Sequence, residues 1–520
     1  MVRGGAVTTE PCILTLGKEF RDGLRGLVNS IEPVDDPARL CLELELAFSY
    51  DEFDALPMGP MLTDLLSAGV FRGTASSGAR AYWRERLGFT IHRWNLVEDH
   101  RAGREPAVFW GGGRILVGLI SRRSYHSRWV PWLVQNLGVD RTWVVSDDGG
   151  LRRALPPETL ISRWSEVPPL EMDRWRAKYG GVAPCWWAKI RRLRERYGLS
   201  RTLEIRFRHA LLVASQRVLR FGALLDRARP TAVLVEYDRN TRGAALVLAA
   251  RRRGIPTFTL LHGVINGPFG YTPIVADTVF CWGTIQRSQL IKLGTPEERI
   301  RIVGFERLEE DPEGEGTGVR KRLGIPDGAV VVVLATNPIE ELDRQKLTRI
   351  FCESVSRAAG IDGIVRLHPS ETIDDYRKVA NSFPGVRFTN NGDLSVEEVF
   401  ELSDVIMVHS SGFGAEGMVK GIPCAVLDVL GSPLGHGLDL VRHADAPRLG
   451  GVSEIILFLM RFRDNEDYRK EMTRGAARFA AEMFAARGES ACRNIAEAVL
   501  QGMRDQETDC GSPTKGEIEA

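Results

Sequence analysis

Short, strongly apolar segments alternate with amphipathic helical segments along the C-terminal part of the chain, and this alternation limits the fold more than any other feature. Residues 329–337 (AVVVVLATN), for example, form a β-branched run between a Gly and an Asn-Pro pair, which is the pattern of a buried strand. Because short connections join strands and helices in turn, the sequence predicts a parallel, doubly wound α/β sheet. The strands expected here are 329–337, 363–369, 386–390, 404–410 and 423–429, separated by helices at 340–358, 374–383, 395–403 and 412–421.

The N-terminal half shows the same alternation less cleanly, and it too predicts a Rossmann-like sheet. Residues 1–105 give no pattern that orders them. The expected strands are 141–148, 231–238, 257–263 and 277–283, with helices at 205–228, 240–254 and 284–293.

A run rich in Gly and Glu, LEEDPEGEGTG at 308–318, lies between the two halves and is typical of an exposed linker. The sequence therefore predicts an N-terminal α/β domain (1–307) and a C-terminal α/β domain (319–503), followed by a disordered tail (504–520). Two such domains are expected to face each other across a cleft, where ligands bind at the carboxyl ends of the strands.

Charge and composition exclude several classes of protein. The 520 residues contain 69 Lys and Arg against 68 Asp and Glu, a formal charge of +1, which does not favour a nucleic-acid partner. The chain has neither an apolar run long enough to span a membrane nor the apolar core of a signal peptide, so we expect a cytoplasmic protein. Its eight Cys are scattered singly, and no Cys or His spacing indicates a metal site.

The strongest candidate site is the segment VHSSGFGAEGMVKGIPCAVLDV at 408–429. An expected strand ends there, and Ser410-Ser411-Gly412 turn directly into a helix whose free backbone N–H groups suit a phosphate or pyrophosphate. Glu416, one turn into the helix, is placed to accept hydrogen bonds from a ribose diol. The alternative is that a serine only caps the helix and that Glu416 is an ordinary first-turn acid.

Two histidine motifs follow other expected strands. Arg366 and His368 end an apolar strand, where polar groups are costly unless something binds them, so His368 is a candidate for contact with a leaving phosphate. His262 and Gly263 end a second strand and open a loop rich in glycine. A hydrogen-bonded structural histidine and a simple strand-ending turn are the alternatives.

Acids that follow strands of the N-terminal half supply candidates for a general base. Asp147 and Asp148 follow one expected strand, and Glu236 and Asp238 follow another. Such a base would face the phosphate-binding wall and take the proton of an acceptor hydroxyl. Aspartates at strand ends are more often turn formers.

The chain has no GxxxxGK[ST] phosphate loop, and it lacks an appropriately placed GxGxxG followed by a ribose acid, which disfavours nucleoside-triphosphate hydrolysis and hydride transfer. No cofactor is therefore expected.

These motifs resemble those of the GT-B glycosyltransferases, and more narrowly those of bacterial enzymes that build capsular and surface polysaccharides. Ser411-Gly412 with Glu416 resembles the nucleotide-sugar element of that superfamily, which the hydrolysing UDP-N-acetylglucosamine 2-epimerases share. His368 followed by Ser410-Ser411 resembles motifs of bacterial sialyltransferases and capsule Kdo transferases, in which these residues contact a CMP-sugar.

Further residues extend the resemblance. Asp147-Asp148-Gly149 resembles the acidic motif that supplies the base in those transferases. His262-Gly263, taken with the Arg-x-His-Pro and Ser-Ser motifs, resembles the CDP-glycerol glycerophosphotransferases, in which both histidines are implicated in transfer. The resemblance implies two Rossmann-like domains closing on the donor, no required metal, and a last helix, here 488–503, that crosses back to the first domain.

The resemblance thus implies a metal-independent glycosyltransferase that moves a sugar from a nucleotide-sugar to a surface-polysaccharide or lipid-linked glycan. A nucleotide-sugar 2-epimerase, a CDP-glycerol glycerophosphotransferase and a catalytically silent scaffold that binds polysaccharide or a synthase partner are the alternatives. Residues 186–230 hold twelve Lys and Arg against three acids, with aromatic residues between them. This stretch is a candidate for peripheral contact with the inner face of an anionic membrane, or else a solvated face.

Overall fold

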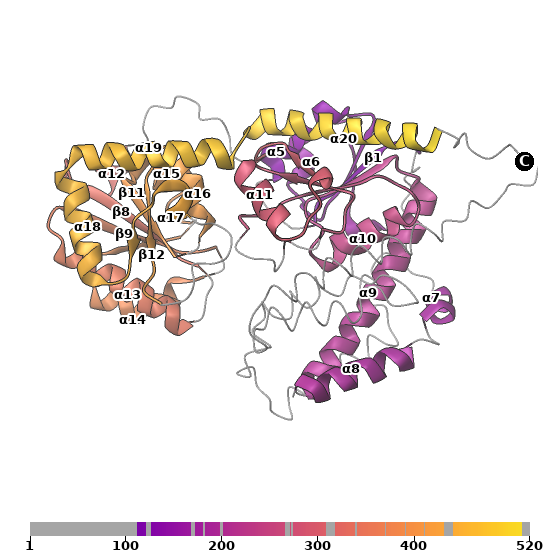
Figure 1. The fold of residues 1–520 in the computed structure, drawn as a ribbon, viewed down its shortest axis with the longest axis horizontal. Coiled ribbons are helices and arrows are strands. Elements are labelled where there is room, and N and C mark those ends of the chain that lie inside the picture. The colour runs from indigo at the N-terminus through magenta and orange to yellow at the C-terminus, as the bar shows by residue number, and fades with distance from the viewer. Residues whose placement is uncertain are drawn as a thin grey trace, which may run out of the picture.

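The structure is a computed structural model that describes residues 112–120, 126–167, 172–179, 183–197, 201–265, 271, 274–307, 318–337, 341–369, 371–390, 392–409, 411–430 and 440–511. The unordered segment 1–105, most of the expected linker (308–317) and Ser410 lie outside these residues. Two domains stand side by side, each built on one sheet (Figure 1).

The N-terminal domain contains a seven-stranded parallel sheet in the order β3-β2-β1-β4-β5-β6-β7. Its strands are β1 (Ile115–Gly118), β2 (Thr142–Val145), β3 (Leu160–Ser162), β4 (Ala232–Val235), β5 (Thr257–Leu260), β6 (Thr278–Cys281) and β7 (Ile300–Ile302). Its helices are α5 (His126–Leu137), α6 (Leu151–Ala154), α7 (Met172–Tyr179), α8 (Ala183–Tyr197), α9 (Arg201–Ala228), α10 (Thr241–Arg251) and α11 (Thr284–Lys292), with short 3-10 turns η2 (Trp164–Glu166) and η3 (Glu297–Arg299).

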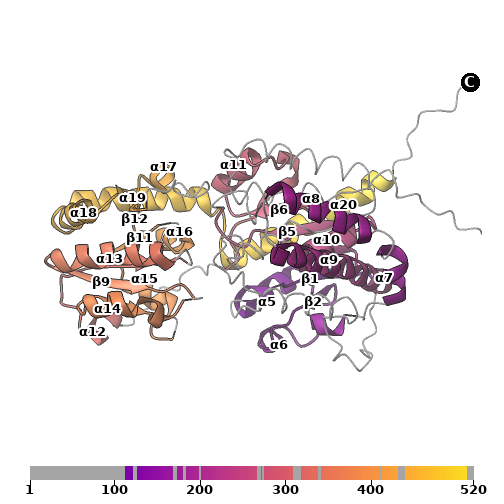
Figure 2. The ribbon, with the colours of Figure 1, turned by 90° about the horizontal axis from the view of Figure 1, so that it is seen from below.

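Alternate residues of each strand bury against helices on opposite faces of this sheet, which is why the strands are apolar throughout. Ile115 and Val117 of β1 pack with α5 and with the C-terminal helix α20 (Gly488–Gly511), whereas Leu116 packs with α9 and α10. The strand order places the switch of winding direction between β1 and β4. Figure 2 shows the helical layers on either side of the sheet.

The C-terminal domain contains a six-stranded parallel sheet in the order β10-β9-β8-β11-β12-β13. Its strands are β8 (Val330–Ala335), β9 (Ile361–Arg366), β10 (Arg387–Thr389), β11 (Val405–Val408), β12 (Cys424–Leu427) and β13 (Arg448–Leu449). Its helices are α12 (Val319–Arg322), α13 (Glu341–Arg357), α14 (Arg377–Ser382), α15 (Val396–Leu402), α16 (Gly412–Val419), α17 (Leu440–Ala444), α18 (Val452–Asp464) and α19 (Glu466–Met483), with one 3-10 turn, η4 (Ile373–Tyr376).

The β-branched run of β8 is central to this domain. Val330, Val332 and Leu334 pack against α13 and α18 on one face, and Val331 and Val333 pack against α12 and α15 on the other. A strand that is buried on both faces must be apolar at every position, and this explains the run of valines. The switch of winding direction falls between β8 and β11.

The chain returns from the second domain to the first through residues 484–488, and α20 then lies along α5 (Figure 1). Trp282, Phe305 and Phe484 stack at the crossing, and the Phe305 N–H donates to the carbonyl oxygen of Ala486 at 2.8 Å. Beyond the crossing, Cys492 and Ile495 of α20 join the core formed with α5. The expected return of a last helix to the first domain is therefore confirmed.

Gly304 is required at this crossing. Its φ of +101° lies in the left-handed region, and a Cβ added there would come within 2.4 Å of the Ala486 carbonyl oxygen. The crossing segment thus passes close to the backbone of the N-terminal domain, and only glycine leaves room for it.

The helix α20 is longer than expected and includes residues 504–511, which the sequence analysis assigned to a disordered tail. Residues 512–520 lie outside the described part of the chain. That segment of the helix contains Arg504 and Asp505, and α20 is amphipathic, with Ile495 and Val499 on its buried face. The shift to a polar sequence therefore marks where the buried face ends, rather than where the helix ends.

Candidate functional site

Glu236 lies at the winding switch of the N-terminal sheet, directly after β4. Its carboxylate accepts a hydrogen bond from the Ile120 N–H, after β1, at 3.2 Å, and its Oε1 lies 3.2 Å from Nε2 of His126. Glu236 and His126 are both buried, so each satisfies the other away from water. Ligands of doubly wound sheets bind at such a switch, on the carboxyl side of the strands.

Arg307 connects this pair to the other domain. Its guanidinium donates to the His262 carbonyl oxygen at 3.2 Å and to Glu306 at 2.8 Å, and it lies 3.7 Å from Glu236. Burial raises the pKa of Glu306, and the neighbouring Arg307 charge opposes that rise. These N-terminal groups hold the guanidinium in a fixed position beside the C-terminal domain.

The N-terminus of α16 lies at the winding switch of the C-terminal sheet, directly after β11. Ser411 is the N-cap and accepts from the Phe413 N–H at 3.3 Å, so the capping alternative describes one of its roles. Ser411 and Gly412 are both half-buried. His409, just before the turn, lies with Nδ1 2.9 Å from the Leu427 carbonyl oxygen, which makes Nδ1 the protonated nitrogen.

Glu416, on the first turns of α16, lies within range of the Arg307 charge. Burial raises the pKa of Glu416 to about 7, while the Arg307 charge lowers it and the Glu397 charge raises it. The carboxyl group therefore changes charge near neutral pH, and it does so next to a guanidinium of the other domain.

Arg366 is the last residue of β9, and His368 follows in the next loop, so both lie at the carboxyl end of this strand. The His368 N–H donates to Oγ1 of Thr336 at 2.9 Å and to Oε2 of Glu371 at 3.1 Å, and Arg344 holds the other oxygen of Glu371 at 3.0 Å. Glu371 is buried, so this network fixes the loop from within. Burial lowers the pKa of Arg366, against the raising effect of Asp393 and Glu397.

Contacts across the domains bring these two switch points together, and we call this region the domain junction. A Cβ built on Gly412 would lie 3.6 Å from Val264, in the loop after β5, and Val264 shares one apolar cluster with Val408 and Ala415. Arg128 of α5 also pairs with Glu397 of α15 at 3.2 Å, although both side chains are exposed and such pairs stabilise little.

The three aspartates proposed as bases have structural partners. Asp238 is buried and accepts from the Val275 and Ala276 N–H groups at 2.6 and 2.8 Å, and burial raises its pKa against the lowering effect of these bonds. Asp147 accepts from the Trp164 N–H at 3.1 Å and pairs with Arg242 at 3.3 Å. Asp148 accepts from the Gly150 N–H at 2.9 Å, as a turn-forming aspartate does.

The structure therefore sorts the predicted residues into two sets. His262, Gly263, Arg366, His368, Ser411, Gly412 and Glu416 follow strands at the carboxyl ends of the two sheets, whereas Ser410 lies outside the described residues. Glu236 was predicted, together with Asp238, as part of an acidic pair after an apolar strand. His126, Glu306 and Arg307 were not singled out from the sequence. Glu306 and Arg307 follow another apolar segment, a signal that could have indicated them.

Within the described residues, no cluster of His, Cys, Asp and Glu has the geometry to hold a metal ion. No helix in that part of the chain is long and apolar enough to cross a membrane.

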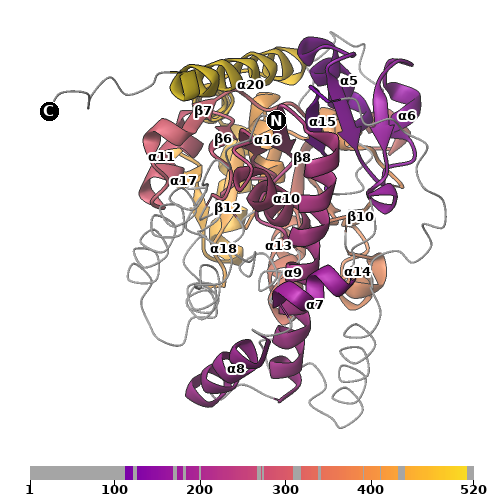
Figure 3. The same cartoon turned by 90° about the vertical axis from the view of Figure 1, so that its right-hand side faces the viewer.

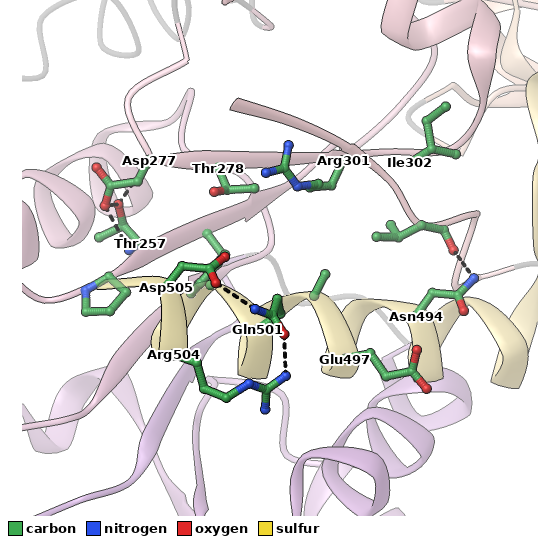
Figure 4. Close-up of a pocket in the computed structure, with 15 residues that line it drawn as sticks. Thr257, Asp277, Thr278, Arg301, Ile302, Asn494, Glu497, Gln501, Arg504 and Asp505 are labelled. Carbon is green, nitrogen blue, oxygen red and sulfur yellow. Dashed lines mark hydrogen bonds between the residues drawn. The ribbon is translucent and has the colours of Figure 1, made fainter. Parts of the chain in front are cut away.

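A separate pocket of about 860 Å³ lies between α20 and strands β5 to β7 (Figure 4). Thr257 and Thr278, the first residues of β5 and β6, line it, so it opens at the amino ends of these strands, opposite to His262. Its polar groups bind one another: Asp277 accepts from Thr257, and Gln501 bonds to Asp505. This end of a parallel sheet is not where such folds bind nucleotides.

Neither a protein-family model nor a curated protein sequence matches the chain. Among solved structures, it is similar to the UDP-GlcNAc 2-epimerase of Neisseria meningitidis bound to UDP-GlcNAc, with 14% identity over 75% of this chain and 100% of that one (TM-score 0.45). It is also similar to S. aureus MnaA with UDP, with 13% identity over 78% of this chain and 100% of that one (TM-score 0.48). A third similar structure is Anabaena Alr3699/HepE with UDP and glucose, with 12% identity over 76% of this chain and 100% of that one (TM-score 0.44).

At such low identity, these similarities concern the course of the chain and not its chemistry. The two facing Rossmann-like domains and the C-terminal helix that returns to the first of them give this chain a GT-B-like fold.

Proposed function

We propose that the chain is a metal-independent glycosyltransferase that moves a sugar from a nucleotide-sugar to a surface-polysaccharide or lipid-linked glycan. The observation that carries the proposal is the approach of Gly412 to Val264 at the domain junction, where the Arg307 charge of one domain acts on Glu416 of the other. A nucleotide diphosphate needs cations and N–H donors, and a ribose needs an acceptor next to them.

In the proposed complex, the phosphates lie at the N-terminus of α16, which starts at Gly412 and offers free N–H groups. Arg307 and His368 add charge or hydrogen bonds, so that negative charge on the departing nucleotide is stabilised without a metal. The Glu416 carboxylate accepts hydrogen bonds from the ribose. The acceptor hydroxyl approaches from the N-terminal domain, where His262 takes its proton. His262 lies two residues before Val264, which approaches Gly412 at the start of α16.

A thermal-shift screen against CMP, UDP, GDP, CDP and dTDP tests the proposal. One nucleotide should raise the melting temperature of the wild type, since a ligand of the folded state stabilises it by mass action. Glu416→Ala should weaken the binding of that nucleotide, measured by calorimetry, whereas exposed Glu401→Ala on α15 should not. Unchanged affinity in Glu416→Ala would contradict the assignment of the ribose site.

The reaction is then assigned with the matching activated donor. Release of nucleotide that depends on an added glycan acceptor supports transfer. Conversion of UDP-N-acetylglucosamine to its 2-epimer, transfer from CDP-glycerol, or binding without turnover would instead support the epimerase, the glycerophosphotransferase or the silent scaffold.

Membrane contact through 186–230 is proposed only for part of that stretch. Figure 3 shows α8 lying at one end of the long α9. Arg194 and Arg208 pair with Glu204, and Arg220 donates to the Val167 carbonyl oxygen, so these three cations have partners within the domain. Arg191 and Arg192 of α8 are exposed. The protein should co-sediment with anionic phosphatidylglycerol vesicles but not with phosphatidylcholine vesicles, and replacing these two arginines should reduce that binding. Equal recovery of the protein with both lipids would contradict the proposed membrane contact.

A further inference from the structure

The imidazole of His262 lies against two tyrosine rings. The Tyr271 ring is stacked on it with a centroid separation of 4.7 Å and an interplanar angle of 6°, and the Tyr237 ring lies at the same separation, tilted by 38°. These tyrosines come from different segments, one after β4 and one after β5. The ring is therefore held between the segments that follow two neighbouring strands, β4 and β5.

The backbone at His262 is fixed as well. Arg307 donates to its carbonyl oxygen at 3.2 Å, and Gln286 Nε2 donates to the next carbonyl, that of Gly263, at 3.1 Å. A Cβ on Gly263 would come within 2.9 Å of the Tyr271 hydroxyl, so glycine allows that ring its close approach. Burial raises the pKa of Tyr271, which keeps its hydroxyl neutral at physiological pH.

We propose that Tyr237 and Tyr271 are positioning residues that hold the His262 imidazole in the orientation needed to accept a proton from the acceptor hydroxyl. This inference rests on the proposed function and adds the residues that orient its base. In the step itself, a ring nitrogen of His262 takes the hydroxyl proton while the hydroxyl oxygen bonds to the anomeric carbon. The bond from that carbon to the phosphate oxygen breaks, and its electron pair leaves with the nucleotide.

A stacked ring is a device for orientation, because it removes the torsional freedom of the imidazole without using its nitrogens. Misplacement of a reacting group by about 1 Å can lower a rate by about a hundredfold. Tyr271→Leu and Tyr237→Leu should therefore lower kcat by about tenfold to a hundredfold with little change in KM for the donor. Tyr271→Phe and Tyr237→Phe keep the ring and should recover most of the lost turnover.

The stack is tested by a spectroscopic signature in addition to turnover. The chain contains nine histidines, so a ring-labelled spectrum is simple, and His262→Gln assigns the relevant signal. Ring currents from two tyrosines should shift the His262 ring protons upfield in the wild type and in the Phe variants, and the shift should shrink in each Leu variant. Tyr468→Leu, on α19 beside Phe458, removes a tyrosine elsewhere and should change neither that signal nor turnover.

Turnover is measured as release of the bound nucleotide from its nucleotide-sugar, for example UDP from UDP-N-acetylglucosamine or CMP from CMP-sialic acid. If none of CMP, UDP, GDP, CDP and dTDP binds the wild type, the proposed function fails. If a nucleotide binds and turnover occurs, but the Leu variants match the wild type or the Phe variants are as slow as the Leu variants, the positioning role alone is wrong.

Discussion

Replacing Glu416 with Gln should change how the stability of the protein depends on pH. Burial raises the pKa of Glu416 from an ordinary value of 4.5 to about 7. Between these two values, the folded protein holds a proton that the unfolded chain has released, so the stability of the wild type falls as the pH rises through this window. The loss is nearly complete at about pH 8, one unit above the folded-state pKa, and a glutamine at this position does not undergo it.

The magnitude follows from the two pKa values. At 1.36 kcal/mol per pH unit, their separation corresponds to about 3.4 kcal/mol, an upper bound because solvent partly screens the half-buried carboxyl. About 2.5 kcal/mol of this is lost between pH 5 and pH 8. For a domain of this size, each kcal/mol is worth about 2–4 °C in melting temperature. The wild type should therefore lose up to about 5–10 °C relative to Glu416→Gln between pH 5 and pH 8.

Calorimetric melting temperatures of both proteins at half-unit steps from pH 5 to 8 provide the assay. Groups that titrate in both proteins cancel in the difference, and Glu401→Gln serves as an exposed control on α15. A difference between wild type and Glu416→Gln that stays constant across this range would refute the reasoning. It would mean that Glu416 is not held in the low-dielectric site next to Arg307.

Three further substitutions probe other parts of the account. Gly304→Ala should destabilise the protein by about 1–3 kcal/mol more than Gly294→Ala. Both glycines have positive φ, but only at Gly304 would an added Cβ come within 2.4 Å of a backbone oxygen. Equal urea midpoints for the two variants would contradict the close crossing. Arg307→Met should lower the free energy of unfolding by about 3–5 kcal/mol, because it removes the guanidinium next to buried Glu306 and Glu236. The loss should be larger at pH 8 than at pH 5, because burial raises the pKa of Glu306 and its charge is present at the higher pH. Arg493→Met, which removes an exposed pair on α20, is its control, and similar losses in chemical denaturation would disprove the buried cluster. Glu371→Gln should lower the free energy of unfolding by about 1–3 kcal/mol and weaken nucleotide binding, because Glu371 holds the backbone of His368. Chemical denaturation and calorimetry measure the two effects, and the exposed control Glu341→Gln should show neither.

Much of the fold follows from the sequence because its strands are buried on both faces. The strands at 330–335, 405–408 and 424–427 have continuous apolar runs that no surface helix would need, and the structure confirms each of them. The central strand β1 was missed, although its ILVG segment is as apolar as the others. It follows a segment without any recognisable order, so no alternation marked its start. The short edge strands β3, β7 and β13 carry too few apolar residues to be identified from the pattern.

The candidate site was predictable only where a motif and a strand end coincide. Ser411, Glu416, His368 and His262 fulfil that condition, so residue type and position indicated them together. The contacts of Arg307 could not be predicted, because they depend on Glu236 and Glu306, which lie far apart in the sequence, and on a second domain. For the same reason, local sequence did not show that Asp147 and Asp238 are already occupied by Arg242 and by two backbone amides.

Hydrogen exchange measured with and without saturating nucleotide tests most directly whether a nucleotide binds at the domain junction. UDP is the first probe, followed by CMP and CDP. The account predicts slower exchange in two segments that come from different domains, 405–419 around the start of α16 and 261–265 after β5. Protection confined to α20 and the adjoining starts of β5 and β6, with these two segments unchanged, would place the ligand in the other pocket and contradict the account.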